Sequence, residues 1–115
     1  MTTLEIANLY FELSNKSDFE NLAKLFTDST TYSSSNTGEY VGGGSIITMQ
    51  KAFHSKFSNL HWQVNKIAEV KSRVIQFDYN FKGTTLEGEV IRSSGLEYVT
   101  ISDEDKIQDI EIRNK

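Results

Sequence analysis

The chain has 115 residues and a formal net charge of −4 at pH 7, with 37% hydrophobic and 11% aromatic residues. This length suits one domain with one core, and the aromatic content excludes a disordered chain. The negative charge, without a stripe of Lys or Arg, argues against nucleic-acid binding. No apolar run approaches the roughly 18 residues that span a bilayer. We therefore expect a single domain over residues 1–115 with no membrane segment.

Cysteine is absent, so the chain has neither disulfides nor thiolate chemistry. The N-terminus lacks the basic and apolar regions of a signal peptide. Both observations favour a cytoplasmic protein.

The first half of the chain is predicted to be helical. Apolar residues recur at helical spacing over about residues 3–15, and Thr2 with Glu5 fits a capping box. Ser17 and Glu20 repeat this pattern before a short second helix. Ser45 is expected to cap a third helix.

A Ser-, Thr- and Gly-rich stretch separates the second and third helices. Its composition predicts short strands or an irregular hairpin, with Tyr32 and Tyr40 on either side of a turn at "SSNTG".

The second half alternates with a period of two and is predicted to form a meander of strands. The turns are expected at "VKSR", "FKGTT" and "DEDK". One face of the first strand is expected to carry Leu60, Trp62, Val64, Ala68 and Val70.

Glu97 is the unusual residue of this half. Strict alternation in "IRSSGLEYVTI", residues 91–101, places its carboxyl group on the same face as Gly95, Val99 and Ile101. Burial there disfavours the charged form, so we predict a raised pKa and a neutral acid that donates a hydrogen bond. The alternative is that Glu97 meets Arg92, Arg113 or a helix end, or that a bulge turns the side chain outward.

These elements predict the α+β class, with three N-terminal helices packed on a strongly curved antiparallel or mixed sheet. Gly95 leaves one inward position without a side chain. A curved sheet wrapped around a helix is therefore expected to form a cone with an internal pocket at its open end.

The order and spacing of four stretches carry a family resemblance. They are "LYFELSNKSDFENLAKLFTDSTTY", "GEYVGGGSII", "FDYNFKG" and "LEYVTISDEDKIQDIEI", which together span about residues 4–113. This arrangement resembles the nuclear-transport-factor-2-like superfamily, a cystatin-like α+β cone, and within it the SnoaL-like and ketosteroid-isomerase-like branch. Members of that superfamily include isomerases, dehydratases, polyketide cyclases and non-catalytic binding or dimerisation modules.

The resemblance implies a role for each of three positions in the family's active site. Tyr10 falls at the tyrosine with which the steroid isomerases bind the substrate oxygen, and Glu97 falls at their protonated oxyanion-hole acid. The position of the general base falls on Ser33 or Ser34, and a serine without an adjacent base cannot remove a carbon-bound proton. The family's steroid isomerisation is therefore not expected by the same route.

The leading hypothesis is a domain that binds a small apolar molecule bearing a carbonyl or hydroxyl group, with an isomerase-, dehydratase- or cyclase-like proton shift and no cofactor. The alternative is a non-catalytic ligand-binding or dimerisation module. We expect a homodimer through the outer sheet face, which carries Asp78 and Arg92.

His54 and His61 are expected on the surface, and no metal site is expected. Tyr10 and Glu97 are the catalytic candidates, and the candidate ligand contacts, for which core packing is the alternative role, are Tyr32, Ser34, Tyr40, Phe53, Trp62, Phe77, Tyr79, Val99 and Ile110.

Overall fold

A computed structural model describes residues 1–114 of the chain as an α+β domain with three helices and six strands. The helices precede most of the sheet in the sequence, as expected for this class. The elements in chain order are α1 (Thr3–Asn15), α2 (Phe19–Ala23), β1 (Thr31–Ser34), β2 (Gly38–Val41), α3 (Gly43–His54), β3 (Phe57–Lys71), β4 (Val74–Thr85), β5 (Val90–Ile101) and β6 (Ile107–Asn114).

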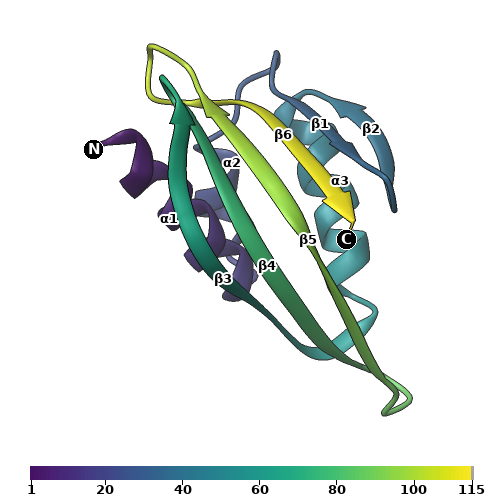
Figure 1. The fold of residues 1–115 in the computed structure, drawn as a ribbon. Helices are drawn as coiled ribbons and strands as arrows, with labels where there is room; N and C mark the ends of the chain where they lie inside the picture. Colours follow the sequence, from purple (N-terminus) through teal and green to yellow (C-terminus); the bar gives the residue numbers. More distant parts are fainter. Residues whose placement is uncertain (115) are drawn as a thin grey trace.

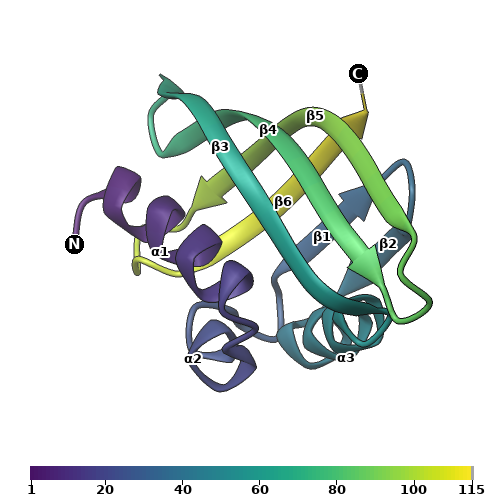
Figure 2. The same ribbon diagram turned by 90° about the horizontal axis from the view of Figure 1, so that it is seen from below.

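The six strands form one mixed sheet in the order β2-β1-β6-β5-β4-β3. Strand β1 runs parallel to β6, and every other neighbouring pair is antiparallel. The sheet is curled but not closed, and the three helices lie together on its concave side (Figures 1 and 2). The predicted α+β class and the curved sheet are therefore confirmed. None of the helices over residues 1–114 is long and apolar enough to cross a bilayer.

Helix α1 is fixed at both ends by side-chain hydrogen bonds. At its start, the Glu5 backbone N–H donates to Thr2 Oγ1 at 3.1 Å, and the Thr2 backbone N–H donates to Glu5 Oε1 at 2.8 Å. This is the predicted capping box. At its end, the Asn15 side chain bonds both backbone groups of Trp62 on β3, at 2.7 and 3.0 Å. These bonds hold α1 across the concave face of the sheet.

The starts of the other two helices differ from the prediction. Asp18, and not Ser17, caps α2, because its carboxylate accepts a hydrogen bond from the Asn21 backbone N–H. Helix α3 begins two residues before Ser45, after Gly42, and has no side-chain cap. A Cβ on Gly43 would lie 2.8 Å from Phe26 Cβ, so close packing against the preceding loop requires glycine at that position.

Strand β3 contains a bulge that the alternation did not reveal. Lys66 has a φ of 51°, and the pairing with β4 shifts between Asn65 and Ala68. The extra residue reverses the two faces beyond it. Ile67 therefore packs against the core, while Ala68 and Val70, both predicted to face inward, are exposed.

The hairpin between β4 and β5 is longer than predicted. The stretch "FKGTT" lies within β4, which continues to Thr85, and the turn falls at residues 86–89. Gly83 had favoured a turn in this stretch, because glycine is common in turns. In the structure a Cβ on Gly83 would lie 2.6 Å from the Phe57 ring, so the glycine makes room for an aromatic side chain on β3.

The core lies between the helices and the concave face of the sheet. Phe77 on β4 and Val99 on β5 are fully buried, and the Phe77 ring meets the Phe11 ring of α1 edge to face, with centroids 4.5 Å apart. This packing fixes the distance between α1 and the sheet, and it leaves a cavity beside Tyr10, toward α3.

Candidate functional site

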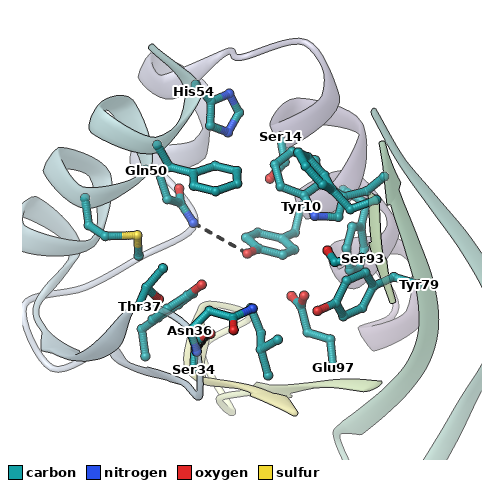
Figure 3. A pocket seen from close by; sticks show the side chains of 17 residues that line it. Tyr10, Ser14, Ser34, Asn36, Thr37, Gln50, His54, Tyr79, Ser93 and Glu97 are labelled. Atoms are coloured by element: carbon teal, nitrogen blue, oxygen red, sulfur yellow. Dashed lines mark hydrogen bonds between the residues drawn. The ribbon is translucent and has the colours of Figure 1, made fainter. Parts of the chain in front are cut away.

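A cavity of about 100 Å³ opens between α1, α3 and the concave face of the sheet. Its lining combines aromatic rings with polar side chains that converge on one end (Figure 3). The sequence-predicted residues that the structure brings together in this lining are Tyr10, Tyr32, Ser34, Phe53, Trp62, Tyr79 and Glu97.

Glu97 lies in the middle of β5 and points into this cavity. Alternation along β5 buries it together with its neighbours Gly95 and Val99, and the side chain is only 2% exposed. Burial raises the pKa of its carboxyl group to about 8, and the nearby Tyr10 hydroxyl opposes this increase. Glu97 is therefore mainly a neutral acid at pH 7.

Neither arginine suggested as an ion-pair partner contributes to the pKa of Glu97, and Arg92 is exposed. Arg113 pairs with Glu111, with Nη2 and Oε1 3.2 Å apart. Among residues 1–114, Oε2 of Glu97 has no hydrogen-bond partner at all. An unpartnered polar atom at this depth is unfavourable unless a bound molecule or an ordered water satisfies it.

Tyr10 reaches the same end of the cavity from α1. Helical spacing buries it with Ile6 and Leu13; its hydroxyl points toward Gln50, and the Glu97 carboxyl group lies close enough to interact with it (Figure 3). The hydroxyl oxygen accepts a long hydrogen bond, 3.5 Å, from Nε2 of Gln50 on α3. Burial, reinforced by the charge that Glu97 carries when ionised, raises the pKa of Tyr10 well above its usual value. The phenol therefore stays protonated and can donate.

Two further tyrosines approach Glu97 from the sheet. Burial raises the pKa of Tyr32 on β1 and of Tyr79 on β4, and the charge of an ionised Glu97 contributes to both increases. Tyr79 pairs with Gly95 across the β4–β5 ladder, and the missing side chain of Gly95 gives the Tyr79 ring its space. The site is thus an acid surrounded by phenols, and no cation within residues 1–114 lowers the pKa of that acid.

The structure adds polar residues that the sequence reasoning missed. Gln50 is 8% exposed and lies on the buried side of α3, four residues after Ile46. That spacing is the signal that could have identified it. Its Oε1, and Oγ1 of Thr37 between β1 and β2, have no hydrogen-bond partner among the described residues.

His54 was predicted to lie on a helix surface, and this prediction is wrong. It is half-buried at the edge of the cavity lining because the rings of Phe19 and Trp62 pack against it, with centroids 4.8 and 5.4 Å away. Its Nδ1 lies 2.8 Å from Ser17 Oγ. Burial lowers the pKa of the imidazole below its usual value, so His54 is neutral at pH 7.

The other predicted ligand contacts lie outside the cavity lining. Phe77, Val99 and Ile110 are fully buried in the packed core, because the inward faces of β4, β5 and β6 meet the helices at those positions. Tyr40 pairs with Tyr32 across β1 and β2 and donates its hydroxyl proton to the Thr37 carbonyl at 3.1 Å. These four residues therefore pack in or against the hydrophobic core, which was the alternative role predicted for them.

Carboxylates are scarce at this site. Ser34, at the position where the resemblance placed a general base, lines the cavity, and among the described residues Glu97 is the one carboxyl group in its lining. Within residues 1–114 no group of three or more His, Cys, Asp or Glu side chains is arranged to hold a metal ion.

The curled sheet, the three helices on its concave face and the partly open pocket between them together define a class of small α+β pocket domains. The family profile described as "SnoaL-like domain" matches residues 7–110. The chain belongs to the SnoaL-like domain family. No curated protein matches the sequence.

Solved structures share the whole fold at low sequence identity. An NTF2-like protein of unknown function from Exiguobacterium sp. 255-15 is 18% identical, with a TM-score of 0.84 over 99% of this chain and 98% of that chain. A protein of ketosteroid-isomerase-like fold from Catenulispora acidiphila DSM 44928, in complex with trimethylamine, is 15% identical, with a TM-score of 0.84 over 96% and 85%. An LEH-like epoxide hydrolase from M. tuberculosis is 9% identical, with a TM-score of 0.85 over 98% and 82%. At these identities the likeness establishes the fold.

Proposed function

We propose that the pocket binds a compact molecule bearing a carbonyl or hydroxyl oxygen, and that Tyr10 and neutral Glu97 donate hydrogen bonds to that oxygen. The observation that carries the proposal is the unpartnered Oε2 of Glu97, an acid 2% exposed, beside the buried Tyr10 hydroxyl. Two hydrogen-bond donors on one ligand oxygen polarise a carbonyl group, and the effect is stronger where both donors are buried, as Tyr10 and Glu97 are.

The size of the cavity supports a small ligand. Its volume is about 100 Å³, whereas pockets for drug-sized ligands measure roughly 300–1,000 Å³ and an engineered cavity of roughly 150 Å³ accepts benzene. A compact ring fits with modest adjustment, and a longer molecule extends past the exposed residues Asn36 and Ser93 of the lining. The trimethylamine complex of the Catenulispora protein is a precedent for a ligand of few atoms in this fold.

A proton shift of the isomerase, dehydratase or cyclase kind also needs a general base. Neutral Glu97 is an acid at pH 7, and within residues 1–114 no carboxylate or imidazole is hydrogen-bonded to Ser34, whose Oγ accepts from the Asn36 backbone N–H. His54 is the candidate among the lining residues, because it is neutral and its Nδ1 is oriented by Ser17 at 2.8 Å. Without such a base the domain is a binding module that polarises its ligand.

The proposed oxygen site is tested with cyclopentanone, a ring with one carbonyl group. Bound to the wild-type protein, its carbonyl stretch moves to lower frequency in the infrared spectrum, because two donors weaken the C=O bond. Tyr10→Phe and Glu97→Leu each weaken binding about tenfold, the value of one hydrogen bond in a buried site. Tyr98→Phe, on the opposite face of β5, is the matched control and leaves binding unchanged. Equal affinity and an unshifted stretch in all four proteins would refute the proposal.

The predicted homodimer through the outer sheet face stays a prediction. Oδ2 of Asp78, on that face, lies 3.7 Å from Nζ of Lys66. Asp78 therefore forms an ion pair within its own chain.

A further inference from the structure

Gln50 is a buried polar residue of the pocket, and a ligand with a single acceptor oxygen would not satisfy its side-chain carbonyl oxygen. Its side chain reaches from α3 to the Tyr10 hydroxyl, and the Glu97 carboxyl group approaches that hydroxyl from β5 (Figure 3). The amide N–H donates to the phenol oxygen, so Tyr10 keeps its own proton to donate, and Glu97 is the acceptor within reach of that proton until a ligand oxygen replaces it. Oε1 of Gln50 has no partner within residues 1–114, although the side chain is 8% exposed.

The unpartnered atoms have opposite requirements. Oε1 of Gln50 only accepts, so it needs a donor, while neutral Glu97 has an unpartnered Oε2 with a proton to give and needs an acceptor beside the Tyr10 hydroxyl. Both requirements arise around one phenol oxygen, because Nε2 of Gln50 is 3.5 Å from it. A ligand that satisfies them therefore carries its donor and its acceptor oxygen on adjacent or nearly adjacent atoms.

We propose that Gln50 is a specificity residue that selects a ligand with an N–H or O–H group next to its carbonyl oxygen, such as a lactam or a hydroxy ketone. This inference rests on the proposed oxygen site and deepens it. A plain ketone of the same shape leaves Oε1 buried and unsatisfied, and a site with such a group discriminates against the ligand that lacks the matching donor.

Two five-membered rings test the inference. In 2-pyrrolidinone an N–H group stands next to the carbonyl group, and in cyclopentanone a CH₂ group takes its place. Dissociation constants for both are measured by NMR titration of the wild-type protein and of Gln50→Met, which keeps the length of the side chain but removes its acceptor. The preference for the lactam over the ketone, taken as the ratio of their two dissociation constants in the same protein, falls about tenfold in Gln50→Met.

Gln63→Met provides the control, because it makes the same chemical change on the exposed face of β3 and keeps the full preference. A second measurement needs no variant: in ¹⁵N-labelled 2-pyrrolidinone bound to the wild-type protein, the N–H proton shifts downfield and shows nuclear Overhauser contacts to the Gln50 side-chain amide.

The two proposals fail in different ways. If both rings bind but Gln50→Met keeps the wild-type preference, or if the lactam N–H shows no contact to Gln50, the role of Gln50 is refuted and the oxygen site stands. If neither ring binds the wild-type protein, the oxygen site is refuted and the inference about Gln50 is refuted with it.

Discussion

Raising the pH from 4.5 to above 8 lowers the free energy of unfolding of the wild-type protein. The part of this loss that Glu97 causes is on the order of 4 to 5 kcal/mol, and Glu97→Gln abolishes that part. The cause is the burial of Glu97, which raises the pKa of its carboxyl group from 4.5 to about 8 in the folded protein. Glutamine is uncharged throughout this range, so its burial costs the same at every pH.

The sign follows from proton binding. Between pH 4.5 and 8 the folded state keeps the proton of Glu97 and the unfolded state has released it, so stability decreases as the pH rises. Below pH 4.5 both states are protonated and the contribution is complete. His54 acts in the opposite direction, because its folded pKa lies below 6.5 and stability rises as the pH passes through that region.

Urea denaturation from pH 4.5 to 9 checks this prediction, with the difference between wild type and Glu97→Gln isolating Glu97 from His54. Glu87→Gln, on the exposed turn between β4 and β5, is the control and follows the wild-type curve. Parallel curves for wild type and Glu97→Gln would contradict a buried neutral acid.

Gly95→Ala destabilises the fold by about 3 kcal/mol, because one methyl group has no space on the inward face of β5. A Cβ there would clash with the backbone carbonyl oxygen of Arg113 on β6 and would lie 2.8 Å from the Tyr79 hydroxyl oxygen. The Arg113 carbonyl oxygen belongs to the sheet and cannot move aside as a flexible side chain does. Thermal and urea unfolding measure the loss.

Gly44→Ala is the matched control for this substitution. Gly44 lies in the first turn of α3, and a Cβ there would meet nothing within 4 Å. The same added methyl group therefore stabilises the protein, by up to about 1 kcal/mol, because alanine loses less backbone freedom than glycine on folding. Equal effects of the two substitutions would mean that the space above Gly95 is not filled as described.

Local patterns in the sequence were sufficient for the residues that depend on one element. The capping box of Thr2 and Glu5 predicted the start of α1, and alternation along β5 predicted the inward direction of Glu97, because cap chemistry and strand period act over a few residues. The position of Tyr10 on the buried side of α1 follows from helical spacing in the same way.

Features that depend on two distant segments could not be read from the sequence. The bulge at Lys66 has no glycine or asparagine at its positive φ, so alternation continued past it and placed Ala68 and Val70 on the wrong face. The packing of His54 depends on Phe19 and Trp62, which lie far from it in the chain. The cavity volume depends on how side chains from α1, α3 and the sheet share one space, and no local pattern sets it.

The most direct test of the site is the pKa of Glu97 itself, measured by a pH titration of its side-chain carboxyl carbon in ¹³C-labelled protein by NMR. A midpoint near 8 is the expected result, with the midpoint absent in Glu97→Gln. A midpoint near 4.5, the value of an exposed glutamate, would contradict the neutral donor on which the oxygen site and the role of Gln50 both depend.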